Sequence, residues 1–323
     1  MNALNEAFPN WKDGIEPCIE CSPYLFDEEY ILGLKKLGFR RISMGMQSFD
    51  DEDLKIMNRR SESTTLLDMY DLVKKAGLNT NVDIIYGMPG QSMEAMLKNL
   101  KKVIDLSPRP ENISLYPLVV RKLTGMDEIA KGKSLHGGEK YGFFNEACRI
   151  LVENGYQWES SVRFSLISGG SNYEQQSLEF QGVSTLGIGS GARSYGPNAN
   201  YAQPYRVQPK PTREILNTYI NANFAEGIPF EVFNFGDDES RRKFIIFSFL
   251  KSKLDTGIYF DNFGENPTDS YPTEFKVLAE MGLVKTVDGW LKLTDKGLRY
   301  HDIVVNLFES EKVQELKKGY TLS

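Results

Sequence analysis

The chain contains 323 residues, of which 41% are hydrophobic and 25% charged, and its formal net charge is −6. These values are ordinary for a globular protein, and the length allows one large domain with a smaller one. The acidic balance argues against a general binder of the nucleic-acid backbone, and no apolar run approaches the roughly 20 residues of a membrane helix.

Short apolar runs alternate with amphipathic helical stretches over the first half of the chain. Strands are predicted at residues 14–23, 40–49, 79–91 and 111–120. Helices are predicted between them, from apolar residues at three- and four-residue spacing, at 27–39, 50–60, 64–78 and 92–106. This alternation predicts an α/β fold with a parallel sheet, whose functional groups gather at the carboxyl ends of the strands.

The remainder of the chain follows two other patterns. Residues 123–235 are less regular and contain one helical stretch and a glycine-rich stretch at 182–196. After them, the order helix, helix, β-wing and final helix predicts a small winged-helix-like domain. We therefore expect two domains, 1–235 and 236–323.

Four polar residues stand at or just past the carboxyl ends of predicted strands: Glu20, Gln47, Arg59 and Asp83. A carboxylate on a buried strand needs a partner, because burying it unpaired is unfavourable. A salt bridge or a helix cap is the simpler interpretation for any one of them, but four such groups on consecutive units favour a ligand site. Gly45 shares the face of Gln47 at strand spacing, which suggests that something approaches that face closely.

Three segments carry a resemblance to a known family. They are IECSP at 19–23, GFRRISMGMQSFDDEDLKIMNR at 38–59 and AGLNTNVDIIYGMPGQ at 76–91. Together they resemble the coproporphyrinogen III oxidase-like (oxygen-independent, HemN/HemW-type) branch of the radical S-adenosylmethionine (SAM) enzymes. YPLVVRKLTGM at 116–126 is similar to a separate sub-branch of that family rather than to the haem-biosynthesis enzyme itself.

The resemblance implies a partial TIM-like (β/α) barrel, a radical SAM core that lacks its first two β/α units. It also implies that Glu20, Gln47, Arg59 and Asp83 lie against the methionine and ribose parts of SAM, with Tyr116 near the adenine. A carboxylate can accept hydrogen bonds from ribose hydroxyls, and an arginine can bind the methionine carboxylate through two parallel bonds. A simple core role is an equal alternative for the tyrosine.

The cysteines depart from the family pattern. Family members hold a [4Fe-4S] cluster through a Cys-x3-Cys-x2-Cys motif, which this sequence does not contain. Cys18 is expected to face with Glu20 and Cys21 to face away, which disfavours a metal role for the pair, while Cys148 suits a helical core. We therefore expect a chain shortened at its N-terminus, naturally or because the gene starts upstream, that performs no radical chemistry alone.

Two functions follow from the resemblance. The first is a radical SAM oxidoreductase, whose family reaction cleaves SAM reductively to a 5′-deoxyadenosyl radical that abstracts hydrogen from a small, tetrapyrrole-like substrate. The alternative is a non-catalytic carrier or scaffold for haem or another tetrapyrrole. Ser171 and Asn172 stand where such carriers show a His-Asn pair, which removes the obvious haem ligand. His136 and His301 are the only histidines, so no histidine-based metal site is expected.

The strand of Glu20 would be an open sheet edge if the first two units are missing. We expect a second copy of the chain, a partner chain or the chain's own residues to cover that edge. The N-terminus has no basic start and no apolar core, and only three cysteines occur. A cytoplasmic location is therefore expected, with neither nucleic acid nor a membrane as a partner.

The glycine-rich stretch GIGSGARS, at 187–194, lacks the lysine of a phosphate-binding loop and the spacing of a dinucleotide fingerprint. A tight backbone turn is the favoured interpretation, with a substrate or cofactor contact as the alternative. Arg163 and Arg193 are candidate anchors for an acidic substrate.

Overall fold

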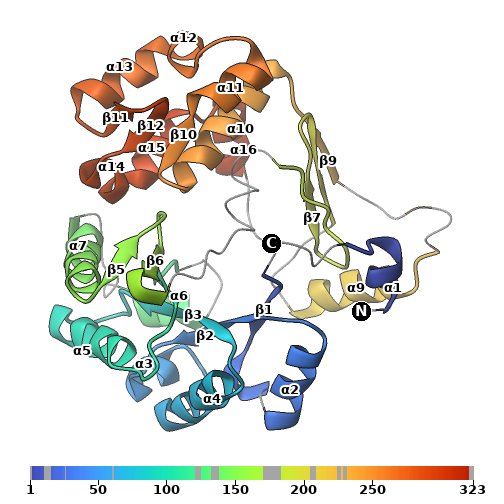
Figure 1. The fold of residues 1–323 in the computed structure, drawn as a ribbon, viewed down its shortest axis with the longest axis vertical. Coiled ribbons are helices and arrows are strands. Elements are labelled where there is room, and N and C mark those ends of the chain that lie inside the picture. Colours follow the sequence, from blue (N-terminus) through green and yellow to red (C-terminus); the bar gives the residue numbers. More distant parts are fainter. Residues whose placement is uncertain are drawn as a thin grey trace. The chain divides into compact units, whose positions relative to one another are not determined.

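The computed structural model of the protein describes residues 2–10, 16–25, 27–59, 62–120, 125–131, 138–169, 183–203, 209–223, 227 and 231–319. The chain divides into two compact units, Met1–Gln175 and Gln176–Ser323 (Figure 1). Residue 236, where a second domain is expected to begin, lies within the second unit, and the assignment of domains 1–235 and 236–323 stays a prediction. No helix within the described ranges is long and apolar enough to cross a bilayer.

A six-stranded sheet in the order β1-β2-β3-β4-β6-β5 forms the centre of the first unit. Its strands are β1 (Cys18–Cys21), β2 (Arg41–Gln47), β3 (Asn79–Tyr86), β4 (Asn112–Pro117), β5 (Tyr156–Trp158) and β6 (Arg163–Leu166). The first four pair in parallel, and β6 and β5 continue the sheet in antiparallel fashion. This confirms the predicted α/β fold and the parallel pairing of its first four strands, whereas the antiparallel strands β6 and β5 were not predicted. Among the strands that the structure describes, β1 pairs only with β2, so the strand of Glu20 is an edge strand, as expected.

Helices precede, connect and follow the strands of this unit. They are α1 (Asn2–Ala7), α2 (Glu28–Lys36), α3 (Asp51–Ile56), α4 (Ser63–Lys75), α5 (Met93–Ile104), α6 (Gly125–Ala130) and α7 (Gly138–Glu153), with 3-10 turns η1 (Pro23–Leu25) and η2 (Ile167–Gly169). The side chains of Asp27, Asp50 and Ser92 accept hydrogen bonds from first-turn N–H groups and fix the starts of α2, α3 and α5. Each helix therefore begins a few residues after its strand, as a crossover between parallel strands requires.

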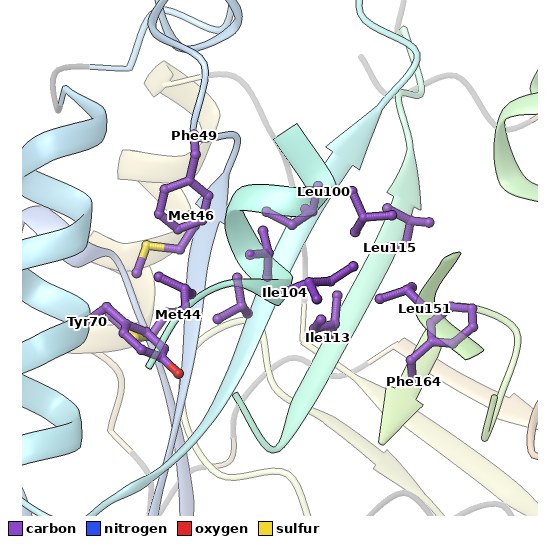
Figure 2. Close-up of a cluster of buried hydrophobic side chains, with 14 of the residues drawn as sticks. Met44, Met46, Phe49, Tyr70, Leu100, Ile104, Ile113, Leu115, Leu151 and Phe164 are labelled. Carbon is purple, nitrogen blue, oxygen red and sulfur yellow. The ribbon is translucent and has the colours of Figure 1, made fainter. Parts of the chain in front are cut away.

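The apolar face of the sheet packs against these helices. Met44 and Met46 of β2 and Leu115 of β4 lie in one buried cluster with Tyr70 of α4 and Leu100 of α5 (Figure 2). Burial of one such side chain stabilises the fold by about 1.5–3 kcal/mol. Contacts between this face and the helices therefore hold the unit together.

The opposite face of the same sheet is polar. The register pairs Glu20 with Ser43 and Ser43 with Asn81, and because successive side chains on a strand alternate, every second residue shares this face. Its polar residues are Cys18, Glu20, Arg41, Ser43, Asn79, Asn81, Asp83, Asn112, Ser114, Tyr116, Arg163 and Ser165. Buried polar groups need hydrogen-bond partners, so this face must be a polar core, a ligand site or both.

The second unit contains two antiparallel three-stranded sheets, β7-β8-β9 and β10-β12-β11. Their strands are β7 (Arg193–Tyr195), β8 (Ala199–Ala202), β9 (Glu231–Asn234), β10 (Lys253–Asp255), β11 (Val284–Val287) and β12 (Trp290–Leu293). Its helices are α9 (Pro209–Ile220), α10 (Asp237–Leu250), α11 (Thr256–Phe263), α12 (Pro267–Ser270), α13 (Pro272–Glu280), α14 (Asp295–Arg299), α15 (His301–Leu307) and α16 (Glu311–Gly319). From α10 to β12 the elements follow the order of a winged helix, and that assignment stays a prediction.

Lys243 of α10 joins the sheet β7-β8-β9 to the helices that follow it. Its Nζ donates to the carbonyl oxygen of Gly196 at 2.8 Å and to Oδ1 of Asn200 at 3.2 Å. The same nitrogen lies 5.1 Å from the ring centroid of Phe235 and 5.8 Å from that of Tyr195, a cation–π arrangement. These contacts span residue 236, which gives a physical reason why the compact unit extends to both sides of that position.

Candidate functional site

The polar face holds two layers of side chains, and Arg41 organises the layer at the amino ends of the strands. Arg41 Nε donates to Glu16 Oε2 at 2.7 Å, and Arg41 Nη1 donates to Asn112 Oδ1. Asn79 Nδ2 donates to Oε1 of the same Glu16 carboxylate. The Arg41 side chain is 1% exposed, so these partners replace the hydration that the cation loses. We call these four residues the floor layer, and its role is structural.

The next layer toward the carboxyl ends consists of Ser43, Asn81, Asp83 and Ser114, which we call the site layer. Asn81 Nδ2 donates to Ser43 Oγ at 2.9 Å and to Asp83 Oδ1 at 2.8 Å. Ser114 Oγ donates to Asn81 Oδ1 at 2.9 Å. Asn81 thus uses both ends of its amide to link three strands and to hold the Asp83 carboxylate on this face.

Asp83 is the perturbed acid of the site layer. Burial raises the pKa of its carboxyl from 3.8 to about 6, and the Glu20 charge adds to the increase. The hydrogen bond from Asn81, the nearby Ser114 hydroxyl and the Arg163 guanidinium act in the opposite direction without cancelling the effect of burial. The ionised carboxylate is therefore less well solvated here than in water. Additional donors from a bound molecule would stabilise it.

Glu20, Tyr116 and Arg163 surround Asp83 on the same face. Glu20 is exposed on the edge strand, whereas the Arg163 side chain is buried beside Ser114 in the sheet register. Burial raises the pKa of the Tyr116 phenol, and the Asp83 and Glu20 carboxylates raise it further. The structure therefore brings three of the predicted residues, Glu20, Asp83 and Tyr116, to one place, together with an arginine that was proposed only as a substrate anchor.

Gln47 ends β2 in an unusual backbone conformation. Its φ is 68°, and the Ser48 N–H donates to the Met46 carbonyl at 2.8 Å across this three-residue turn. The pairing of β2 with β3 shifts between Met44 and Gln47. The turn carries the amide back over Gly45, where an added Cβ would lie 2.6 Å from Gln47 Nε2. In this structure the group that approaches Gly45 is the Gln47 side chain, and the approach of a ligand to this face stays a prediction.

Arg59 follows α3 and is half-buried. Its N–H donates to the Leu54 carbonyl at 2.9 Å, after Asn58 has left the helix with φ 54°. No hydrogen bond between described residues joins the Arg59 side chain to Gln47 or to Asp83. The structure therefore does not bring Arg59 into the site layer, and its predicted contact with the methionine carboxylate stays a prediction.

Two residues that link the site layer, Asn81 and Ser114, are absent from the sequence-based prediction of the site. A signal for both was present, because polar residues alternate along β3 as Asn79, Asn81 and Asp83. The same alternation precedes Tyr116 on β4. A period of two in polar residues on otherwise apolar parallel strands marks the face that carries them.

The described cysteines do not fit a [4Fe-4S] cluster. Cys18 shares the polar face with Glu20, while Cys21 pairs with Met44 on the apolar face, which confirms the predicted opposite orientation. Burial raises the pKa of the Cys18 thiol to about 11, although Arg41 opposes the effect, so this group is not a ready thiolate. Cys148 is buried in the core. Within the ranges that the structure describes, no three His, Cys, Asp or Glu side chains are grouped to hold a metal ion.

The sequence contains two histidines, His136 and His301. His301 lies in the second unit, at the start of α15, and burial lowers its pKa to about 4. His136, Ser171 and Asn172 lie outside the described residues.

The glycine-rich stretch forms a tight turn. Gly189 has φ 114° and Gly191 has φ 76°, and the Ala192 N–H donates to the Gly189 carbonyl at 3.2 Å. The Gly187 N–H donates to Ser194 Oγ at 3.0 Å. An added Cβ at Gly187 would clash with the backbone of Arg193. These contacts agree with the favoured interpretation of a backbone turn, in which Gly187 is required for close approach of two chain segments.

Substituting Gly187 with alanine is expected to lower the free energy of unfolding by about 1–3 kcal/mol, because the methyl group would overlap backbone atoms that have no rotamer to change. Thermal unfolding followed by circular dichroism measures the effect. Gly142→Ala is the control: its position in α7 has no atom within 4 Å of an added Cβ, and alanine favours a helix. Equal stability of Gly187→Ala and the unmodified protein would show that the turn is not packed as described.

A match to a family model indicates the class of protein. Residues 9–103, which include β1 to β3 and most of α5, match the radical SAM superfamily. The fold agrees, since coproporphyrinogen III oxidase (HemN) from Escherichia coli, described as a radical SAM enzyme, superimposes with a TM-score of 0.73 at 21% identity. That superposition covers 91% of this chain and 70% of the other.

Two relatives show which radical SAM proteins the chain is similar to. The chain is 26% identical over 322 residues to an oxygen-independent coproporphyrinogen III oxidase of Synechocystis sp., covering 92% of this chain and 66% of that protein. It is 32% identical over 155 residues to the heme chaperone HemW of Haemophilus influenzae, covering 47% of this chain and 40% of that protein. Part of the chain thus matches the radical SAM superfamily, and the chain is similar to these two kinds of protein. It spans less than two thirds of the length of either relative. The family implies SAM and a [4Fe-4S] cluster as cofactors.

Proposed function

We propose that this chain is the SAM-binding part of a radical SAM oxidoreductase of the coproporphyrinogen oxidase-like kind. The observation that carries the proposal is the site layer, in which Asn81 holds the perturbed Asp83 carboxylate beside Glu20. Two carboxylates and one buried guanidinium give this part of the face a net negative charge. Such a surface suits a ligand that combines hydroxyl donors with a sulfonium cation.

The residues divide the ligand between them according to their chemistry. Asp83 and Glu20 accept hydrogen bonds from the ribose hydroxyls, and Tyr116 lies against the adenine. The Gln47 amide offers both a donor and an acceptor at the end of β2. Arg59 binds the methionine carboxylate. SAM bound in this way would supply the reactive group of the family, but the described cysteines do not fit the cluster that would cleave it.

The proposal for the substrate of the complete reaction rests on sequence similarity alone. The relatives that cover most of this chain are named for coproporphyrinogen III or heme. We therefore propose a tetrapyrrole-like small molecule as the substrate class. A second copy of the chain along the open edge of β1 is the corresponding proposal for assembly, with a different partner chain as the alternative. Light scattering that shows only a monomer would contradict the second copy.

Isothermal titration calorimetry with SAM tests the binding proposal. We expect saturable binding, and we expect Glu20→Gln to weaken it about tenfold, because a charged hydrogen-bond acceptor contributes about 1.5–3 kcal/mol. Asp68→Asn, which changes an exposed acid on α4, is the control and should bind SAM as the unmodified protein does. A folded protein that shows no binding at about 1 mM SAM would overturn the proposal.

A further inference from the structure

The turn at Gln47 is held by more contacts than a strand end needs. A positive φ is unfavourable for a residue with a side chain, so it persists only where the surroundings impose it. The next residues supply that constraint. Ser48 is 0% exposed, its N–H closes the turn onto Met46, and its Oγ accepts from the Asp50 N–H at 3.1 Å.

Asp53 ties this turn to the loop after the neighbouring strand. Its Oδ2 accepts from Ser48 Oγ at 3.0 Å and from Gln91 Nε2 at 3.0 Å. The other end of the Gln91 amide, Oε1, accepts from the Gly87 N–H at 2.8 Å. One carboxylate therefore connects the exits of β2 and β3, the two strands that carry Gln47 and Asp83. We call Ser48, Asp53, Gly87 and Gln91 the exit clamp.

Helix α5 holds the following residue from the other side. The Phe49 N–H donates to Asn99 Oδ1 at 2.7 Å, and the Phe49 carbonyl accepts from Lys102 Nζ at 2.6 Å. Both backbone groups of Phe49 are therefore engaged, and its ring is buried in the core. Chain movement after Gln47 is blocked on one side by the exit clamp and on the other by this helix.

A helix-capping role does not account for Asp53. It lies in the first turn of α3, where acidic residues are common, but the cap of that helix is Asp50, whose side chain accepts from the Glu52 and Asp53 N–H groups. The Asp53 carboxylate instead faces Ser48 and Gln91 and is 9% exposed. Burial of the Asp53 carboxylate is unfavourable, and the helix is already capped by Asp50. We therefore assign Asp53 to the connection between the exits of β2 and β3.

We propose that Asp53, oriented by Gln91, is a positioning residue that sets the Gln47 amide over the polar face of the sheet. Asp53 touches no ligand in this arrangement. It imposes the backbone turn that aims Gln47 at the site layer, so a bound molecule meets a fixed amide and not a mobile one. This inference rests on the proposed function, since it assigns Asp53 a part in SAM binding.

A double-mutant cycle on SAM affinity tests the proposal. Asp53→Leu is expected to weaken binding about tenfold, whereas Asp53→Asn keeps an oxygen acceptor for both donors and should stay within about twofold of the unmodified protein. Gln47→Gly keeps the positive φ and removes the amide. In that background Asp53→Leu should change affinity by less than about twofold, because the group it positions is gone. Equal losses in both backgrounds would overturn the proposal.

Amide hydrogen exchange separates a failure of this inference from a failure of the proposed function. The Ser48 N–H, which closes the turn, should exchange slowly in the unmodified protein and in Asp53→Asn, and fast in Asp53→Leu. If Asp53→Leu does not fold, Gln91→Leu replaces it, because Gln91 is at a half-buried surface position. The Ser48 N–H should exchange fast in this variant as well. If SAM does not bind at all but the Ser48 N–H exchanges as expected, the role of the exit clamp in the turn is supported and the assignment of SAM as the ligand is wrong. Slow exchange of Ser48 in both leucine variants would overturn the clamp itself.

Discussion

Replacing Arg41 with methionine is expected to lower the free energy of unfolding of the first unit by about 3–5 kcal/mol. The methionine fills most of the volume but donates no hydrogen bond, so the floor layer loses the cation that faces the Glu16 carboxylate and the Asn112 amide. Because the Arg41 side chain is only 1% exposed, water cannot replace its hydrogen bonds without disrupting the sheet. Urea denaturation followed by circular dichroism measures the loss.

The neighbouring arginine provides the matched control for this experiment. Arg40 precedes β2 and is exposed, and Arg40→Met should change stability by no more than about 0.5 kcal/mol. The same loss in both variants would indicate a general effect of charge removal. An Arg41→Met protein as stable as the unmodified one would show that the floor layer is not the buried network described above.

Asp83→Asn is expected to raise stability and lower SAM affinity at the same time. Because the folded-state pKa of Asp83, about 6, lies above its ordinary value of 3.8, the folded protein binds this proton more tightly than the unfolded chain does. The contribution of Asp83 is therefore most favourable at low pH and is lost as pH rises toward and past about 6. At pH 7 the asparagine variant should be more stable by about 1–2 kcal/mol, while SAM binds about tenfold more weakly.

Stability measured against pH checks the sign of this effect. The advantage of Asp83→Asn over the unmodified protein should grow between about pH 4 and pH 6 and then level off. Asp68→Asn, in which the changed acid is exposed, should show no such pH-dependent advantage. If stability rises while SAM affinity falls, the residue is retained for binding. Substituting a purely structural carboxylate would instead lower both the stability of the protein and its affinity for SAM. A stability loss at pH 7 in Asp83→Asn would contradict this account.

Much of the site could be anticipated from single strands. Glu20 and Asp83 each stand on a short apolar run that is followed by a turn, and parallel strands present their carboxyl ends at one edge, so their convergence follows from local pattern. Gly45 and Gln47 likewise belong to one strand face. This reasoning missed the side-chain hydrogen bonds between strands. Asn81 bonds to residues of its own strand and of both neighbouring strands.

Arg59 and the domain boundary at residue 236 stay predictions, because both depend on more than local pattern. A residue after a helix has no periodicity that fixes the direction of its side chain, and the structure leaves Arg59 outside the site layer. The change of pattern near residue 236 is real in the sequence, but Lys243 makes contacts across it that no local pattern encodes.

The sequence by itself determined the alternation of the first four strands with their helices, the positions of Glu20, Gln47 and Asp83 near strand ends, and the absence of the cysteine motif, because these depend on residue type and on periods of two and 3.6 residues. Tertiary structure decided which polar residues share a hydrogen bond, how Asp53 connects two strand exits and why Gln47 adopts a positive φ. Those outcomes depend on the register between segments far apart in the chain. Register is set by the packing of the whole sheet against its helices, and no stretch of sequence carries it alone.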